Sequence, residues 1–324
     1  MNAGPFVAGF DIGGTNIRGV GLVGGVVAED ILRSERPADP DAIVTCVVDM
    51  AERLAQCHGG APLVGLGVGC AGVVDADGVV RVSPNIATLV EFPLRDRLIA
   101  ALMSRGFEID DAKVIVDNDA TMATLAEVRT GAARGVGDVV YVSLGTGIGA
   151  GFVLDGAIRR GAHGAAGEVG HMTVVHDGLL CVCGRRGCWE QYASGTALNR
   201  LAVAAAREGR LPWALARTDG APESVDSALV VDGVAAGDAD SVAVLETLAH
   251  WVAVGLADLV NTLDPAMIVI GGGLADIGAP LLDAIRRAYG EVMVDLAHRA
   301  PVTMALSHHG DRSGTIGAAL AVAP

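Results

Sequence analysis

One short pattern occurs twice in this chain of 324 residues, and it limits the folds that the chain can adopt. The first copy has an apolar run, Val7 to Phe10, then the Gly-rich turn DIGGTN and an alternating run from Ile17 to Val23. The second copy has the apolar run VVYVSL, the Gly-rich stretch GTGIGAG, a strand GFVL, and Asp155-Gly156, which suits a type I′ turn. We interpret the repeat as an internal duplication, which predicts two similar α/β lobes with a cleft between them.

Helical and strand patterns alternate along the rest of the chain. A segment with helical periodicity runs from about Asp39 to His58, and a buried strand, Leu63 to Gly69, follows it. Residues 198–255 are predicted to be mainly helical around one loop, and Met267 to Ile270 to form another buried strand. The last segment, SGTIGAALAVAP, has the pattern of an apolar helix. This alternation predicts an α/β rather than an all-α architecture.

Composition and charge exclude several classes of protein. Hydrophobic residues make up 51% of the chain, but no apolar run reaches the ~20 charge-free residues needed to cross a bilayer. The first residues have no basic region ahead of a long apolar one, so we expect a soluble, cytoplasmic protein rather than a secreted one. The net charge of −15 argues against a nucleic-acid partner, which would need a basic stripe. Small anions remain possible ligands, because oriented backbone N–H groups can bind them locally.

Three of the six cysteines lie within eight residues of one another, beginning ten positions after a histidine. A disulfide is not expected in a reducing cytoplasm, and a redox pair is normally spaced CxxC. One imidazole and three thiols at these spacings suit a tetrahedral zinc ion with no ligand position left for water. We therefore predict a structural zinc site with the ligands His171, Cys181, Cys183 and Cys188. The other three cysteines, which have apolar neighbours, are interpreted as small buried hydrophobes.

Two further motifs carry groups that suit phosphoryl transfer. Asp117, Asn118 and Asp119 end an apolar strand just before a helix, where a carboxylate could accept a proton from a hydroxyl that attacks phosphorus. A helix N-cap explains the local pattern about equally well. The two Gly-Thr loops could hold successive phosphates of a nucleotide if both face one cleft, although neither matches a P-loop or a GxGxxG turn. Glu168 and Glu190 flank the predicted zinc ligands and could point at a polyhydroxylated substrate.

In this order, the motifs resemble those of the ROK sugar kinases (repressors, open reading frames and kinases), within the actin, Hsp70 and hexokinase superfamily. The resemblance covers nearly the whole chain and rests on DIGGT, the Asn-Asp pair, LGTGIGAG, GEVGH, CxCGxxGCxE with ASG, and a late Gly-Gly turn. It implies a duplicated, two-lobed actin/hexokinase-like (ribonuclease H-like) fold. The small lobe would comprise residues 1–119 and a C-terminal helix at about 308–324, and the large lobe, with the zinc-binding loop, residues 120–307. Members of the family are commonly dimers or tetramers, so we expect a homodimer or homotetramer.

What the resemblance implies for function is transfer of phosphate from ATP, with Mg²⁺, to the 6-hydroxyl of a hexose, with glucose favoured. Asp119 looks like the general base, and Asn118 like its neighbouring sugar ligand. His171 would bind zinc through one ring nitrogen and the sugar through the other. The implied sugar ligands are Asn85, Asn118, Asp119, Glu168, His171 and Glu190. The implied nucleotide contacts are Asp11, near Mg²⁺, with Gly13, Gly14, Thr15, Gly145, Thr146 and Gly147 at the phosphates, and Gly272 and Gly273 at adenosine.

The chain departs from the family pattern at two places, and several alternatives remain open. Cys70-Ala71-Gly72 stands where many members have Pro-Gly, and Leu89 where many glucokinases have Trp, which weakens the expectation of glucose over another hexose. The alternatives are a kinase for mannose, fructose or N-acetylmannosamine, a glucokinase that uses polyphosphate, and, more distantly, a non-catalytic sugar sensor or repressor. A repressor would need a helix-turn-helix module, for which the ten residues ahead of DIGGT leave no room, and the net charge disfavours DNA binding.

Overall fold

The computed structural model describes residues 4–27, 31–294 and 296–323, and it divides into two compact units. Unit 1 comprises residues 1–137, 151–167 and 311–324, and unit 2 comprises residues 138–150 and 168–310. The expected division ended the first part of the small lobe at Asp119. In the structure α3 (Asp119–Arg129) stays with unit 1, because it packs on α10 (Ser313–Val322), and residues 151–167 also belong to unit 1.

Unit 1 is built on a six-stranded sheet with the strand order β3-β2-β1-β5-β9, in which β4 also pairs with β2. The central strands β1, β5 and β9 run parallel, and β2 returns antiparallel to β1 through a short hairpin at residues 13–15. The strands are β1 (Phe6–Ile12), β2 (Asn16–Val23), β3 (Val26–Val27), β4 (Leu32–Glu35), β5 (Leu63–Cys70) and β9 (Val114–Asn118). A separate three-stranded sheet contains β6 (Val73–Val74), β7 (Val80–Val82) and β8 (Val90–Phe92).

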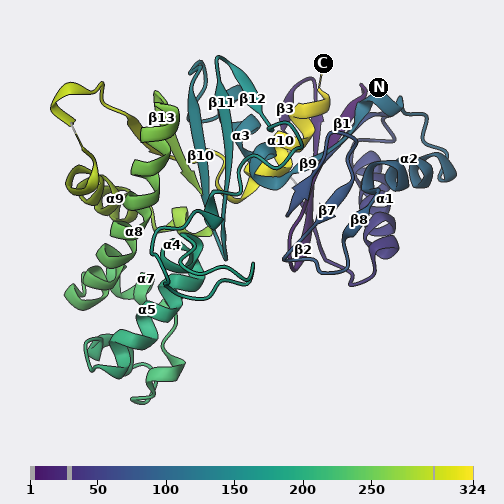
Figure 1. Ribbon diagram of the computed structural model, residues 1–324. Coiled ribbons are helices and arrows are strands. Elements are labelled where there is room, and N and C mark those ends of the chain that lie inside the picture. Colours follow the sequence, from purple (N-terminus) through teal and green to yellow (C-terminus); the bar gives the residue numbers. More distant parts are fainter. Residues whose placement is uncertain (1–3, 28–30, 295, 324) are drawn as a thin grey trace. The chain divides into compact units, whose positions relative to one another are not determined.

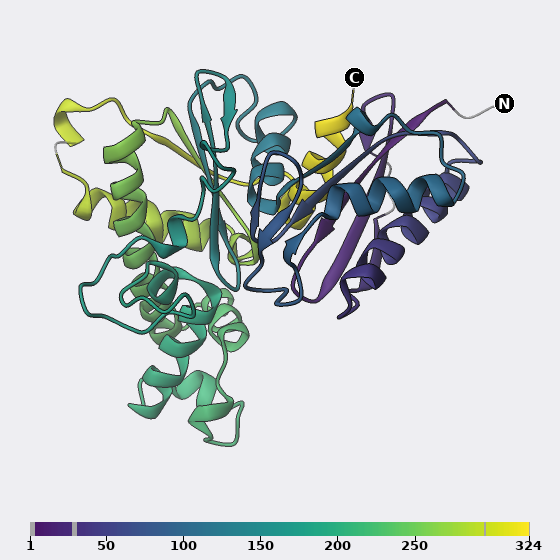
Figure 2. The ribbon, with the colours of Figure 1, turned by 45° about the vertical axis from the view of Figure 1, so that its right-hand side comes forward.

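Helices cover both faces of the large sheet in unit 1 (Figure 1). Side chains alternate between the faces of a strand, so Phe6, Ala8 and Phe10 of β1 join the core under α1 (Pro40–Cys57) and α2 (Leu94–Ser104). Figure 2 shows these two helices side by side. On the other face, α3 and α10 lie close to the strands because the sheet presents glycines there: a Cβ added at Gly67 would overlap the backbone of α10.

The predicted helix from about Asp39 to His58 is confirmed, and its ends follow the local sequence. Asp39 is the N-cap, and its carboxylate accepts the Ala42 N–H at 2.8 Å. Pro40 occupies the first turn, where its missing N–H costs nothing. His58 forms the C-cap. The buried residues of α1 repeat with helical spacing along one side, which packs against the sheet.

The second sheet repeats the topology of the first. Its order is β12-β11-β10-β13-β14, with β10, β13 and β14 parallel and β11 antiparallel to β12. The strands are β10 (Val139–Leu144), β11 (Ile148–Leu154), β12 (Ala157–Arg159), β13 (Met267–Gly271) and β14 (Thr303–Leu306). Asp155 and Gly156, which connect β11 and β12, both have positive φ, as the predicted type I′ turn requires. The matching strand orders confirm the predicted duplication, and the boundary between the units falls within β11.

The rest of unit 2 is mainly helical, as predicted for residues 198–255. The helices are α4 (Glu190–Ala193), α5 (Gly195–Arg207), α6 (Pro212–Leu215), α7 (Ser227–Ala235), α8 (Ala239–Leu263) and α9 (Ala279–Val292). Among the residues that the structure describes, α8 is the one helix long and apolar enough to cross a membrane by length and composition. Its apolar window is 56% buried, and α8 packs against α9, α7 and α5, so its apolar residues form core contacts of unit 2.

Candidate active site

The first Gly-rich loop is a tight hairpin between β1 and β2 in unit 1. The Gly13 N–H donates to the Asn16 carbonyl at 3.0 Å and closes the turn. Arg36 holds the tip: its backbone N–H donates to the Thr15 carbonyl at 2.9 Å, and its Nε donates to the Gly14 carbonyl at 2.9 Å. Sequence reasoning missed Arg36, because the hairpin motif ends twenty residues earlier and no local pattern marks the arginine.

Asp11 lies at the end of β1, in a group of acidic side chains within unit 1. Burial, followed by the negative charge of Asp119, raises the pKa of Asp11 to about 7, and Arg18 opposes the shift. Arg18 is paired with Asp11 in the β1–β2 register and forms an ion pair with Asp311, 3.2 Å away. A cation would stabilise a carboxylate that burial and a neighbouring carboxylate destabilise, so the Asp11 oxygens suit a hard cation such as Mg²⁺.

Asn118 and Asp119 lie where β9 ends and α3 begins. Asn118 is the N-cap of α3: its Oδ1 accepts the Thr121 N–H at 3.0 Å, so the capping interpretation is correct for this residue. Its Nδ2 donates to the Gly72 carbonyl and to Asp119 Oδ1, each at 3.0 Å. Oδ1 of Asp119 also accepts the Ala120 N–H at 2.8 Å, and burial raises the pKa of Asp119. The carboxylate of Asp119 is therefore held in one orientation and accepts a proton more readily than an exposed aspartate.

Asn85 and Leu89 are two further sequence features of unit 1. Of the three cysteines expected to be buried there, only Cys70 is buried; Cys46 is partly exposed and Cys57 is exposed. Asn85 is exposed on the turn after β7, and a Cβ added at Gly14 would lie 3.6 Å from the Asn85 Cβ. Leu89, which stands where many glucokinases have Trp, is fully buried and belongs to the core of unit 1. The Leu89 N–H donates to the carbonyl of Ile86, the residue after Asn85, at 2.8 Å. Leu89 can therefore influence this region by packing beneath the turn that carries Asn85.

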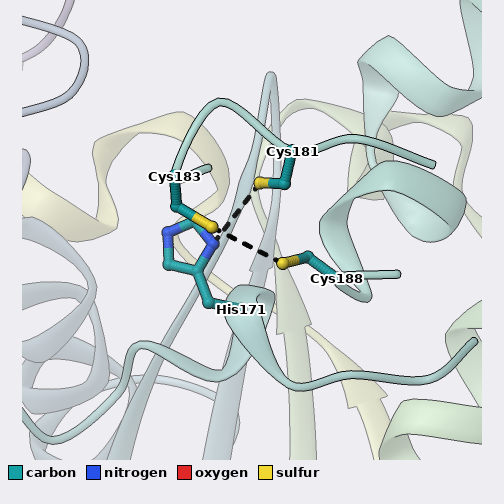
Figure 3. Close-up of side chains that lie close together, drawn as sticks. All are labelled: His171, Cys181, Cys183 and Cys188. Carbon is teal, nitrogen blue, oxygen red and sulfur yellow. Dashed lines mark hydrogen bonds between the residues drawn. The ribbon is translucent and has the colours of Figure 1, made fainter. Parts of the chain in front are cut away.

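The four predicted zinc ligands come together in unit 2 (Figure 3). Their ligand atoms all lie within 4.8 Å of one another. Cys183 Sγ and Cys188 Sγ are 3.6 Å apart, and His171 Nδ1 is 3.7 Å from Cys181 Sγ. The two sulfur atoms of a disulfide are about 2.05 Å apart. Two ligand atoms bound to one tetrahedral zinc, each with a bond of about 2.0–2.3 Å to the metal, are roughly 3.5–3.8 Å apart. The donor set of three thiols and one imidazole therefore fits a structural zinc ion.

Local features of residues 181–188 bring the cysteines together and favour a thiolate at Cys183. Gly184 and Gly187 have positive φ, a conformation that a residue with a Cβ rarely adopts, and they let the chain turn back between the cysteines. The Gly184 N–H donates to the Cys181 carbonyl at 2.9 Å. The Arg185 N–H donates to Cys183 and lowers the pKa of that thiol, which favours the thiolate form that binds metals.

Glu168 and Glu190, two predicted sugar ligands, lie next to the predicted zinc-binding loop, residues 171–188 of unit 2. The second Gly-rich loop contacts Glu190. His171 directs Nδ1 at Cys181 and has Nε2 3.8 Å from Glu168 Oε2. Glu190 begins α4 immediately after the loop, and its Oε2 accepts the Ile148 N–H at 3.0 Å. A Cβ added at Gly147 would overlap this same oxygen. The loop at Gly145 to Gly147 and the Glu190 carboxylate thus form one contiguous structure.

A cavity of about 550 Å³ opens beside the second Gly-rich loop. Its lining includes Gly145, Thr146 and Gly273, three of the predicted nucleotide contacts, and the first residues of α5 and α7. The Gly195 N–H donates to the Gly145 carbonyl at 2.7 Å, so α5 begins against the loop. Gly272 does not line the cavity; it has a positive φ and packs against Leu144 at the end of β10. One cavity therefore adjoins both the predicted phosphate loop and Gly273, a predicted adenosine contact.

The structure brings the predicted site residues together in two groups, one in each unit. Unit 1 contains Asp11, Gly13, Gly14, Thr15, Asn85, Asn118 and Asp119, and unit 2 contains Gly145, Thr146, Gly147, Glu168, His171, Cys181, Cys183, Cys188, Glu190, Gly272 and Gly273. Sequence reasoning missed four charged residues of unit 1 that contact the predicted site residues or their neighbours. They are Arg18, Arg36, Arg160 and Asp311. Their partners are distant in sequence, so only covariation among relatives could have indicated them.

Comparison with known proteins identifies the family. The model of the ROK family matches residues 7–323. The chain belongs to the ROK family. The glucokinase of Streptomyces coelicolor is 37% identical over 319 residues, which cover 96% of this ROK protein and 95% of that relative. A ROK family glucokinase from Streptomyces griseus, solved in complex with glucose and AMPPNP, matches with a TM-score of 0.85 and 33% identity over 98% of each chain. The ROK hexokinase from Thermus thermophilus has a TM-score of 0.77 and 31% identity, covering 98% of this chain and 97% of that one.

These matches also decide the fold class. The structures from Streptomyces griseus and Thermus thermophilus match this ROK protein over nearly its entire length, including both copies of the duplicated sheet. The predicted actin/hexokinase-like α/β fold is therefore confirmed.

Proposed function

We propose that this protein transfers phosphate from ATP to glucose and forms glucose 6-phosphate. Its family and fold make it a sugar kinase of the hexokinase type. The choice of glucose and ATP is supported by the Streptomyces coelicolor relative, named glucokinase, and by the Streptomyces griseus glucokinase, which was solved with glucose and AMPPNP. The observation in this chain that carries the chemistry is the oriented Asp119 carboxylate at the start of α3.

Asp119 is proposed to act as the general base. Its Oδ1 is occupied by the Asn118 side chain and the Ala120 N–H, which leaves Oδ2 for the sugar 6-hydroxyl. The raised pKa of Asp119 favours uptake of the hydroxyl proton as the sugar oxygen attacks the γ-phosphorus. Phosphoryl transfer depends mainly on positioning and charge neutralisation, so a fixed carboxylate beside the nucleophile supplies much of what the protein must contribute.

The remaining residues would bind and orient the reactants. Asp11 would hold Mg²⁺, which neutralises phosphate charge when bound, and the backbone N–H groups of the two Gly-rich loops would face the phosphates. The cavity beside Gly145 and Gly273 would take the nucleoside. Asn85, Asn118, Glu168, His171 and Glu190 would bind the sugar hydroxyls. A structural zinc held by His171 and the three cysteines would fix the ring, with Nε2 directed at Glu168.

A coupled assay of ADP release from purified protein, ATP and Mg²⁺ tests the proposal. The sugars are glucose, mannose, fructose, N-acetylglucosamine and N-acetylmannosamine, each at several concentrations. A kcat/KM for glucose well above the others is expected. A preference for another hexose would replace glucose as the substrate, and turnover with polyphosphate but not with ATP would replace the donor. No turnover with any sugar and either donor would leave a sensor as the better interpretation and would refute the proposed kinase activity.

A further inference from the structure

The segment that carries Asp119 is held by an ion pair to a second segment of unit 1, residues 160–167. Arg160 Nε donates to Asp117 Oδ2 at 2.6 Å. The Asp117 side chain is only 7% exposed, and its Oδ1 accepts the Asn118 N–H at 2.8 Å. Both oxygens of this buried carboxylate are therefore used, one for each segment. A buried carboxylate requires such partners, because burial disfavours an unpaired charge.

Hydrogen bonds continue from this ion pair to Asp119. Asp117 fixes the backbone of Asn118, and the Asn118 side chain then bonds to the Gly72 carbonyl, the Thr121 N–H and Asp119 Oδ1. Asn118 thus uses its backbone N–H, both amide hydrogens and its amide oxygen in one network. A change in the direction of Asp117 would reach the Asp119 carboxylate through a single intervening residue.

Two further contacts restrain residues 160–167. The Ala166 N–H donates to the Arg160 carbonyl at 3.0 Å and closes the segment into a loop. Gly164 has a positive φ and lies so close to Val74 of β6 that an added Cβ would overlap the Val74 carbonyl. Gly167, the last residue of the segment in unit 1, directly precedes Glu168 in the sequence. The Arg160 ion pair therefore connects two segments of unit 1. One precedes Asp119, the proposed base, and the other precedes Glu168, a proposed sugar ligand.

We propose that Arg160 is a positioning residue for catalysis, which acts on Asp119 through Asp117 and Asn118. This inference rests on the proposed function, with Asp119 as the general base. Without Arg160, the Asp117 carboxylate would be buried without a cationic partner, so it would turn toward water. This movement weakens its hydrogen bond to the Asn118 N–H and loosens the Asp119 carboxylate. Misplacement of a reacting group by about 1 Å can lower a rate by about a hundredfold.

The test compares four variants in the coupled assay with glucose and ATP. For Arg160→Met we expect kcat to fall by about 10- to 100-fold, while KM for ATP stays within about twofold. Arg160→Lys should recover part of the loss, since an ammonium can still pair with Asp117. Asp117→Asn combined with Arg160→Met should be several-fold more active than Arg160→Met alone, because no unpaired charge is left buried.

Arg105→Met is the matched control. The Arg105 side chain is 40% exposed, close to the 45% of Arg160, and it also pairs with carboxylates of another element of unit 1, Asp49 and Glu52 of α1. This control should keep kcat within about twofold of wild type. A kcat for Arg160→Met within twofold of wild type, or a double variant no more active than Arg160→Met, would overturn the proposal.

Hydrogen exchange separates this inference from the proposed function. In Arg160→Met, the amides of Asn118 and Thr121 should exchange at least tenfold faster than in wild type, while amides of α1 and α2 stay unchanged. This readout needs no turnover. If the wild-type protein phosphorylates no sugar, the proposed function fails, and unchanged exchange at Asn118 and Thr121 would by itself refute the role of Arg160.

Discussion

Replacement of Gly147 by alanine should weaken sugar binding through Glu190. A Cβ added at Gly147 would overlap Glu190 Oε2, because the two atoms would be closer than 3.0 Å, a separation below which real Cβ contacts are essentially never found; it would also lie 3.0 Å from Glu190 Cδ. That oxygen accepts the Ile148 N–H at 3.0 Å. Gly147 is not among the glycines with positive φ, so alanine suits the backbone itself. The effect of the substitution therefore comes from contact with the carboxylate.

The size of the effect follows from the hydrogen bond to the sugar that a displaced Glu190 carboxylate would lose. To reach ordinary van der Waals distance, the Glu190 carboxylate must move by on the order of 1 Å, which separates it from the Ile148 N–H. A hydrogen bond to a charged group contributes about 1.5–3 kcal/mol. Because 1.4 kcal/mol corresponds to about tenfold, we expect kcat/KM for glucose to fall by about 10- to 100-fold.

A double-mutant cycle in the coupled kinase assay checks this reasoning. Glu190→Ala alone should lower kcat/KM for glucose, since it removes a proposed sugar ligand. In the Glu190→Ala background, Gly147→Ala should cost less than about threefold, because the obstructing oxygen is gone. If the losses of the two single variants simply multiply in the double variant, Gly147 does not act through Glu190 and the reasoning is refuted.

Five further predictions concern the base, the metals and two glycines. Asp119→Asn should lower kcat by at least about a hundredfold and leave glucose binding detectable by calorimetry; a loss under tenfold would count against a general base. Removal of zinc by a strong chelator, verified by metal analysis, should lower Tm and glucose affinity together, and no change in either would contradict the proposed zinc site. Because the pKa of Asp11 is about 7 in the folded state against 3.8 for an ordinary aspartate, its ionisation opposes folding, so the metal-free protein should lose stability as pH rises from about 4 to 7. Protons and Mg²⁺ compete for the same carboxylate, so Mg²⁺ affinity in a calorimetric titration should weaken by up to about tenfold per pH unit below 7, and Asp11→Asn should abolish this dependence. Gly67→Ala should destabilise unit 1 by about 1–3 kcal/mol or more in denaturant titrations, since its Cβ meets the α10 backbone, whereas Gly290→Ala, with nothing within 4 Å on α9, should stabilise by about 0.5–1 kcal/mol.

Much of the fold was predictable because its signals are local. The two strand and Gly-rich hairpin patterns predicted the duplication, and both sheets have the same strand order. The helical periodicity from about Asp39 to His58 predicted α1, and Asp155-Gly156 predicted a type I′ turn, which has two positive φ values. The convergence of the four predicted zinc ligands belongs to the same class, since these residues lie within eighteen positions and their spacing alone limits how they can meet.

Features that depend on contacts between distant segments were not predictable from one sequence. The expected boundary at Asp119 and the division into compact units differ over α3, which belongs to unit 1 because it packs against α10. Leu89 drew attention as a specificity position, but its place in the core follows from the packing of unit 1.

The sequence by itself thus determined the elements, the repeat and the residue types of the candidate site, because periodicity, turn chemistry and ligand spacing act over a few residues. Only the tertiary structure decided which charges pair across long stretches of chain. Arg160 is 43 residues from Asp117, and Arg36 is 22 residues from Gly14. A buried carboxylate needs a partner, but its local sequence contains nothing that selects which of many arginines will be brought to it.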